Sequence, residues 1–245
     1  MTVQHNRLNI TALDCVYLPV TDARRSAEWF MKHFGMTEEE RDGEHLRLRL
    51  SGGASLALIE SVNRNTYESL PVHIKCNDAR RAHGELVKQA VQCTEAVDWH
   101  HYVDFNFRDP DGNPIGVISD PAWAPHPNNY FQLDGIFLGS ARFASTLEWY
   151  LDVLGTDIEY DFTVATSSSP EARMCYFRGV TFTLFESPGV AVAHKFCDYR
   201  TLDAAADHAF LLEKGVRVTP LLSIGTRRGF SFFDPEGREF GLVEG

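Results

Sequence analysis

The sequence predicts an α+β fold of two tandem domains, each built from two units in which a strand and a helix precede further strands. Two repeated segments carry this prediction. Leu-Asp-Cys-Val-Tyr-Leu at 13–18 returns as Leu-Asp-Gly-Ile-Phe-Leu at 133–138, and Phe-Asn-Phe-Arg-Asp-Pro-Asp-Gly at 105–112 returns as Phe-Ser-Phe-Phe-Asp-Pro-Glu-Gly at 230–237. A repeat this long indicates a duplicated domain rather than a solenoid, whose periods are about 20 to 50 residues. The order of elements also repeats inside each half, which gives four units of about 60 residues.

The first half shows this order of strands and helices. Residues 12–20 alternate and are rich in Val, Leu and Tyr, which indicates a strand. Asp22 is a typical N-cap for a helix over about residues 23–34, and Gly35 is a typical residue to end it. The remaining elements are predicted as strands at 46–50, 55–60 and 72–76, a helix over about 80–90, and two strands flanking the turn at 111–112.

The two halves meet in the segment Pro-Ala-Trp-Ala-Pro-His-Pro-Asn-Asn at 121–129. Its three prolines cannot continue a helix or a central strand, so the segment indicates a semi-rigid linker. We therefore expect a first domain over residues 1–120, a linker over 121–130 and a second domain over 131–245.

Composition indicates a soluble protein and excludes some partners. The chain has 245 residues, is 44% hydrophobic, and has a net charge of −11, which argues against a nucleic-acid phosphate track. No apolar run approaches the roughly 20 residues of a membrane span, and the N-terminus lacks a signal-peptide core. The five cysteines form no CxxC pair, which is typical of reduced thiols. We expect a cytoplasmic monomer or homodimer with no nucleic-acid or membrane partner.

The pattern resembles the vicinal oxygen chelate superfamily, which includes glyoxalase I, bleomycin-resistance proteins and extradiol dioxygenases. The most specific matches are the opening Leu-Asp-x-Val-x-Leu-Pro-Val-x-Asp at 13–22, the helix that ends in Phe34-Gly35, and Phe-Arg-Asp-Pro-Asp-Gly-Asn at 107–113. The resemblance implies two tandem glyoxalase-like domains whose βαβββ units form curved mixed sheets, with a metal or a small molecule held in a concave cup. It does not by itself imply one activity, because this fold hosts several.

The resemblance also implies positions for metal ligands. Members generally place a His or Gln early in the first strand, a Glu at the end of the fourth, a His at the start of the fifth, and a Glu in the eighth. The corresponding residues here are Cys15, Glu60, His73 and Gly116 in the first half, and Gly135, Glu186, His194 and Gly241 in the second. The Glu–His pair is therefore kept twice, while the outer pair is lost twice. Neither half supplies the two His and one Glu of an extradiol dioxygenase, which argues against that activity.

A remaining Glu–His pair leaves two interpretations open. Glu60, His73, Glu186 and His194 could hold Mn, Fe, Ni or Zn if water or substrate supplied further ligands. Catalytic metal sites usually have three protein ligands, however, so we expect no bound cofactor. In the alternative, each Glu faces solvent or a loop at a strand end and each His bonds within the sheet. The sequence does not decide whether Glu60 faces His73 or His194.

Cysteines follow both histidines, as His73-Ile-Lys-Cys76 and His194-Lys-Phe-Cys197. Residues three apart in a strand point to opposite faces, so these pairs cannot share one ion, and the cysteines should pack as small buried hydrophobes. Cys15 is the exception, because it occupies a ligand position that should face the cup. Its thiolate could bind a metal or attack an electrophile.

Glycine at three ligand positions should enlarge the cup. Gly116, Gly135 and Gly241 remove side chains near its centre, while the rings of Tyr17 and Phe137 lie two residues beyond the first-strand positions. Gly116→Leu and Gly241→Leu should then harm ligand binding more than folding. In the alternative, the rings fill this space themselves.

Two adjacent histidines complete the predicted site. His100 and His101 lie on the approach to the seventh strand, where alternation would let only one of them point into the cup as a general base near neutral pH. We expect a ligand in a cup lined by Tyr17, His73 and one of these two, or in a counterpart around Phe137 and His194.

These features favour a glyoxalase- or bleomycin-resistance-like small-molecule-binding protein with a degenerate metal site, or an enzyme that needs no metal. The alternative is a divalent-metal-dependent lyase or isomerase that uses a Glu–His pair to polarise adjacent substrate oxygens. The sequence does not identify the ligand.

Overall fold

Four units follow one another along the described chain. The last three are βαβββ, and the first has the same plan with one extra two-residue strand at 52–53. The computed structural model describes residues 8–39, 45–61, 72–123, 125, 131–164, 171–187, 194–224 and 227–245. The elements of the first half are β1 (Ile10–Val20), α1 (Ala23–Phe34), β2 (Thr37–Glu38), β3 (Leu46–Arg49), β4 (Gly52–Gly53), β5 (Ser55–Glu60), β6 (Val72–Cys76), α2 (Ala79–Lys88), β7 (Val97–Trp99), β8 (Tyr102–Arg108) and β9 (Pro114–Ser119). Those of the second half are β10 (Phe131–Ser140), α3 (Phe143–Leu154), β11 (Ile158–Val164), β12 (Ala172–Phe177), β13 (Phe182–Glu186), β14 (Lys195–Thr201), α4 (Ala204–Glu213), β15 (Leu222–Ile224), β16 (Arg227–Phe233) and β17 (Glu239–Glu244).

Helix α1 begins and ends at the predicted residues. The Asp22 carboxylate accepts a hydrogen bond from the Arg25 backbone N at 2.9 Å, which satisfies one of the free N–H groups of the first turn. Gly35 adopts φ 64°, a left-handed conformation that favours glycine, and its N–H donates to the Met31 carbonyl at 3.1 Å. Phe30 and Phe34 are buried beneath the helix.

The chain divides into two compact units. Unit 1 holds the chain up to Cys15 and from Leu138 onward, and unit 2 holds Val16–Phe137. Strand β1 therefore begins in unit 1 and ends in unit 2, whereas β10 begins in unit 2 and ends in unit 1. Most of the proline-rich linker predicted at 121–130 lies outside the described residues, and the predicted domain boundaries stay predictions.

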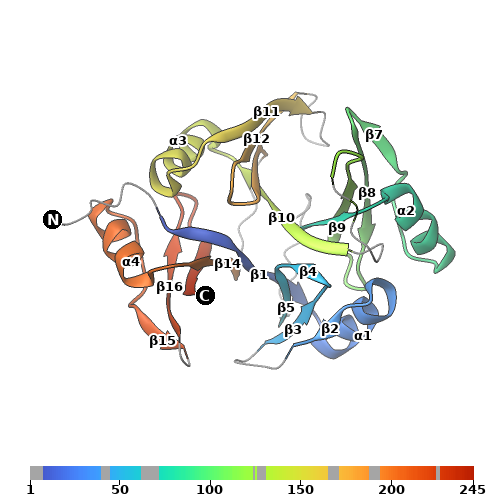
Figure 1. Cartoon of the computed structure of the whole chain (residues 1–245), viewed down its shortest axis with the longest axis horizontal. Helices are drawn as coiled ribbons and strands as arrows, with labels where there is room; N and C mark the ends of the chain where they lie inside the picture. The colour runs from blue at the N-terminus through green and yellow to red at the C-terminus, as the bar shows by residue number, and fades with distance from the viewer. Residues whose placement is uncertain are drawn as a thin grey trace. The chain divides into compact units, whose positions relative to one another are not determined.

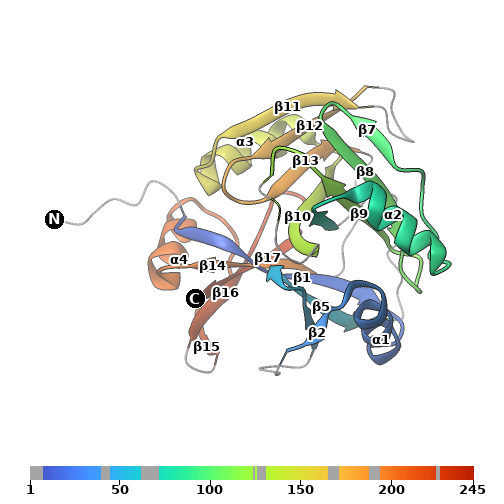
Figure 2. The ribbon, with the colours of Figure 1, turned by 45° about the vertical axis from the view of Figure 1, so that its right-hand side comes forward.

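Unit 2 contains two sheet segments, ordered β1-β5-β3-β2 and β10-β6-β9-β8-β7. In the second segment, β6 pairs with β9 in parallel, while β8 pairs with β9 and β10 with β6 in antiparallel fashion. Figures 1 and 2 show α1 beside β2, β3 and β5, and α2 beside β8 and β9. Helix α2 packs on β8 through aromatic rings, because the His83 ring meets the Phe105 ring edge-on with centroids 5.1 Å apart.

Unit 1 repeats this plan with segments ordered β11-β12-β13-β10 and β15-β16-β17-β14-β1. The His208 ring of α4 meets the Phe230 ring edge-on at 4.8 Å, as His83 does with Phe105 in unit 2. Single hydrogen bonds are repeated as well. The Thr94 N–H donates to the Asn106 carbonyl at 2.8 Å, and the matching bond from Thr219 to Ser231 is also 2.8 Å.

These repeated contacts fix which residues of the two halves correspond. The Ser61 N–H donates to Val20 and the Ser187 N–H donates to Ser140, which makes Glu60 and Glu186 equivalent, as predicted. In the parallel pairs, however, His73 lies opposite Gly116 and Asp198 lies opposite Gly241. The prediction that His194 corresponds to His73 is therefore wrong. His194 precedes β14, and Asp198 takes the equivalent position.

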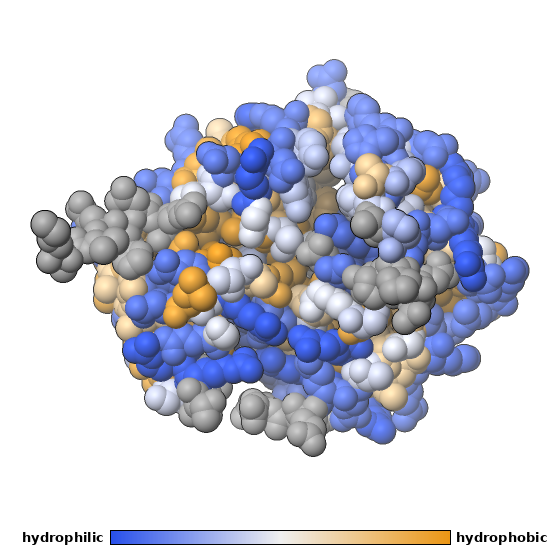
Figure 3. Space-filling model, viewed as in Figure 1, coloured by the Kyte–Doolittle hydropathy of each residue, from blue (hydrophilic) through white to orange (hydrophobic). Residues whose placement is uncertain are grey.

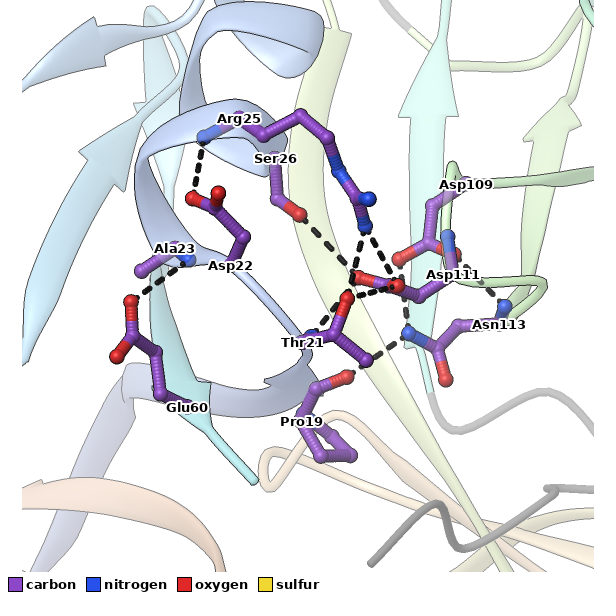
Figure 4. Close-up of polar contacts among 10 residues, drawn as sticks. All are labelled: Pro19, Thr21, Asp22, Ala23, Arg25, Ser26, Glu60, Asp109, Asp111 and Asn113. Carbon is purple, nitrogen blue, oxygen red and sulfur yellow. Dashed lines mark hydrogen bonds and ion pairs between the residues drawn. The ribbon is translucent and has the colours of Figure 1, made fainter. Parts of the chain in front are cut away.

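The repeated Asp-Pro-x-Gly segment closes a turn onto the start of a helix (Figure 4). The Asp109 carboxylate accepts from the backbone N of Asp111 at 2.9 Å and of Asn113 at 2.7 Å, while Gly112 adopts φ 85°. The Asp111 carboxylate in turn accepts from the Thr21 hydroxyl and from Arg25, both at 2.6 Å. Desolvation alone would raise the pKa of Asp111, but these hydrogen bonds outweigh it and lower the pKa. The repeated Asp-Pro-x-Gly segment, on which much of the resemblance depends, therefore has a structural role: it forms a turn and joins that turn to the start of α1.

The face drawn in Figure 3 carries both hydrophilic and hydrophobic residues. Figure 3 shows hydrophilic residues over much of the visible face, in keeping with the net charge of −11. Within the described ranges, no helix is both long enough and apolar enough to cross a membrane.

Candidate functional site

The His73 imidazole fills the space that glycine was predicted to clear. A Cβ on Gly116 would lie 2.0 Å from His73 Cδ2, and a Cβ on Gly135 would lie 3.3 Å from His73 Cβ. The ring of Phe137 lies against the imidazole, with centroids 4.1 Å apart. The enlarged cup is therefore not found at Gly116. The same is true at Gly241, where a Cβ would lie 1.9 Å from an Asp198 carboxylate oxygen.

The predicted ring partners are also rearranged. Phe137, predicted to line a cup with His194, packs on His73 instead, and both residues belong to unit 2. Tyr17 is buried on β1, in the other sheet segment of unit 2, where its ring meets His45 edge-on at 6.0 Å.

His73 is held in its neutral form. Its side chain is only partly exposed, and burial, which disfavours the charged imidazolium, acts with the nearby Lys75 ammonium to lower the pKa of His73 from 6.5 to about 3. At physiological pH the uncharged ring has one nitrogen that can donate a hydrogen bond to a ligand and one that can accept a hydrogen bond.

Because of this lowered pKa, the free energy of unfolding should depend on pH through His73. Between pH 3 and 6.5 the unfolded chain binds a proton on His73 that the folded chain does not, so the stabilisation is complete above pH 6.5 and is lost as the pH falls toward 3. One group contributes a slope of at most about 1.4 kcal/mol per pH unit. Urea unfolding of the wild type and of His73→Gln from pH 4.5 to 7 should give a stability difference that changes in the wild type's favour as pH rises. A difference independent of pH would contradict this assignment.

The Glu60 carboxylate binds the start of helix α1. Glu60 ends β5 at an exposed position, and its Oε1 accepts a hydrogen bond from the Ala23 backbone N at 3.1 Å, at the start of α1 (Figure 4). The carboxylate therefore stabilises the positive end of a helix. Glu186 ends β13 and is likewise exposed, in the position predicted for a strand end that faces solvent.

The residues present do not fit a metal of the superfamily's usual kind. Cys15 is fully buried, Glu60 is bonded to a helix N-terminus, and Gly116 carries no donor. Among the residues that the structure describes, no group of three or more His, Cys, Asp or Glu side chains could hold an ion. His194 is partly buried before β14, outside the position that His73 occupies.

The cysteines behave as buried hydrophobes. Burial raises the pKa of Cys76 to about 12 and the pKa of Cys197 well above its usual value, so neither is a ready thiolate at neutral pH. Cys76 lines a pocket on the helix side of unit 2 together with Ala82 and Phe131. That pocket lies on the face opposite to His73, since residues three apart in a strand point to opposite faces.

His100 and His101 form the turn between β7 and β8 rather than part of a strand, so the alternation argument does not apply to them. Trp99 pairs with Tyr102 across the hairpin, and His100 adopts φ 54°. Both histidines are exposed. His101 Nε2 lies 3.3 Å from the carboxylate of the buried Asp120, the residue after β9.

A polar face of unit 2, missed in the sequence, surrounds His73. Registered residues on neighbouring strands share a face, and two rows result. The first row is Lys75, Ile118 and Asp104, and the second is His73, Gly116 and Asn106. The alternate residues Phe105 and Phe107 are buried on the other face. The signal was the alternation of polar and apolar residues along β6 and β8.

Aromatic rings flank the first row. The rings of Trp99 and Tyr102 stack at 5.8 Å with an interplanar angle of 15°, and Trp123 lies 6.0 Å from Tyr102. Lys75 Nζ lies 4.9 Å from the centre of the Trp123 ring, a distance at which a cation is attracted to the ring face. We call the two rows with these three rings the polar face of unit 2.

The equivalent positions in unit 1 are closed by ion pairs. Asp198 stands where His73 does, and Arg200 stands where Lys75 does. Asp198 is paired with Lys195 at 3.0 Å, and Arg200 is paired with Asp14 at 2.5 Å. These charges of unit 1 therefore neutralise one another.

Known proteins share this fold. Residues 10–117 match the Glyoxalase/Bleomycin resistance protein/Dioxygenase superfamily. Glyoxalase I from Zea mays superposes with a TM-score of 0.67 at 16% identity, over 95% of this chain and 92% of its own. A point mutant of glyoxalase I from Zea mays gives 0.71 at 16% identity over the same shares. A protein from Bacillus subtilis named as a dioxygenase gives 0.71 at 12% identity, over 97% of this chain and 86% of its own. No curated protein matches the sequence.

The family model thus matches one segment, residues 10–117, and nearly the whole chain has the fold of these glyoxalase I and dioxygenase structures. This confirms the resemblance and the α+β fold class predicted from the sequence.

Proposed function

We propose that this chain binds a small organic molecule on the polar face of unit 2, without a resident metal ion. The observation that carries the proposal is the combination of a stacked aromatic pair, Trp99 and Tyr102, with the Lys75 ammonium beside Trp123. Flat apolar walls with a few well-placed polar groups are typical of small-molecule sites. A ligand ring would add to this stack.

Binding is favoured over acid–base catalysis by His73 because the imidazole on this face is poorly matched to proton transfer at neutral pH. A general base works best when its pKa is near the working pH. The pKa of His73 is lowered to about 3, which makes its imidazole a weak base. The divalent-metal lyase or isomerase alternative lacks the ligand set described above.

Indole provides a direct test, because it offers a flat ring without charge. We expect indole to shift the amide and side-chain NMR resonances of Trp99, Tyr102 and Trp123. Tyr102→Ala should weaken binding roughly fivefold, since one aromatic contact is worth about 1 kcal/mol. Tyr160→Ala is the matched control, because Tyr160 is an exposed tyrosine on β11 of unit 1 and should leave binding unchanged.

Two results would overturn the proposal. One is the absence of any indole-dependent shift on the polar face at millimolar indole. The other is about one equivalent of Mn, Fe, Ni or Zn in protein purified without a chelator or a histidine tag, lost on His73→Ala. That second result would replace the proposal by a metal-dependent lyase or isomerase.

A further inference from the structure

The polar face of unit 2 presents opposite charges at a fixed separation. Lys75 and Asp104 both lie in register with Ile118, one on each side of it. Neighbouring strands are about 4.8 Å apart, so the two Cα atoms are roughly 10 Å apart on one face. The positive and the negative group therefore stand on either side of Ile118, at a spacing that a small ligand can bridge.

Asp104 is a carboxylate in need of a partner. It is half-buried, and the described residues supply its side chain with no hydrogen bond or ion pair. Desolvation raises its pKa, which is the response of a carboxylate that has lost water without gaining a cation. A ligand cation would reverse this cost.

Asn106, two residues further along β8, adds a second acceptor. Its Oδ1 is buried and has no hydrogen-bond partner among the described residues. Residues two apart in a strand lie about 6.6 Å apart on the same face, so one ammonium group with three donors can reach both oxygens. An unsatisfied buried acceptor costs free energy that a ligand donor recovers.

We propose that the ligand of this face is a zwitterion with a flat ring, an aromatic amino acid or a close derivative. Its ammonium binds Asp104 and Asn106, its carboxylate binds Lys75, and its ring packs on Tyr102 and Trp123. This rests on the function proposed above and adds the ligand's charge pattern. The corresponding cation of unit 1, Arg200, forms an ion pair with Asp14.

Four probes with one ring separate the contributions of the two charges. Indole is neutral, tryptamine is a cation, indole-3-propionate is an anion, and L-tryptophan is a zwitterion. Calorimetric titration should rank L-tryptophan about tenfold tighter than either singly charged probe. Asp104→Asn should remove the advantage of L-tryptophan over indole-3-propionate, and Lys75→Gln should remove its advantage over tryptamine.

Matched controls are Asp98→Asn on the same hairpin and Lys88→Gln on α2, both exposed and both expected to keep the wild-type ranking. Equal affinity for all four probes would overturn this inference and leave the proposed function intact. Retention of the ranking in Asp104→Asn would overturn it as well. Failure of all four probes to bind would overturn both proposals.

Discussion

Gly116→Ala is expected to lower the free energy of unfolding by about 2 kcal/mol, the usual range for overpacking. The added Cβ would lie 2.0 Å from His73 Cδ2 and 2.1 Å from Nε2, so the ring has to leave its place against Phe137. The loss should be largely relieved in the double variant Gly116→Ala/His73→Ala, because the second change removes the clashing ring. Urea unfolding of the two single variants and the double variant measures this coupling.

Gly84→Ala is the matched control for this experiment. Gly84 lies inside α2, and no atom outside its own helix backbone comes within 4 Å of the place that an alanine methyl would take. Alanine should therefore raise the free energy of unfolding by about 0.5–1 kcal/mol. If Gly116→Ala unfolded at the wild-type denaturant concentration, the imidazole would be free to move aside. The close packing of His73 on this strand would then be refuted.

Arg238→Ala is expected to cost about 3–5 kcal/mol, because it leaves a buried carboxylate without its cation. Arg238 Nε lies 2.6 Å from Asp234 Oδ2, and both side chains are almost fully buried, with 4% and 0% exposed. The Tyr150 hydroxyl donates to the same oxygen at 2.8 Å, but it does not neutralise the charge. Thermal and urea unfolding at pH 7 would measure the loss.

Two further variants serve as comparisons for Arg238→Ala: one breaks an exposed ion pair, and the other replaces Arg238 by the residue found at the equivalent position of unit 2. Arg173→Ala breaks a pair with Asp161 that is more than 40% exposed on both sides, and it should cost no more than about 1 kcal/mol. Arg238→Asn should cost less than Arg238→Ala, since Asn113 at the equivalent position donates to both Asp109 and the Pro19 carbonyl. Equal losses for Arg238→Ala and Arg173→Ala would show that burial of the Asp234 pair is not what stabilises it.

Local chemistry made much of the fold predictable. The Asp22 cap and the left-handed Gly35 act within a few residues, so the bounds of α1 follow from the sequence. The duplication was visible for the same reason, because its repeated segments form turns and strand starts with strict local requirements.

The candidate site was less predictable, because it depends on strand register. The sequence contains His194 and Asp198 four positions apart, and only the pairing of Asp198 with Gly241 shows which of them corresponds to His73. Likewise, the Glu60 carboxylate accepts a hydrogen bond from Ala23, and the Phe137 ring packs on His73. Both partners are distant in the sequence. A ligand position inherited from a family does not reveal such local partners.

The passage of β1 from unit 1 to unit 2 bears on the order in which a ribosome can complete the protein. The Asn9 backbone N and side-chain Nδ2 donate to Asp207 at 3.0 and 2.9 Å, across 198 positions of sequence. Unit 2 has all its residues once Phe137 is made, whereas unit 1 contains the first described residues and also the last. The segment around Asn9 must therefore wait, with its hydrogen-bonding groups in water, until Asp207 has been translated. The unit that is begun first is finished last.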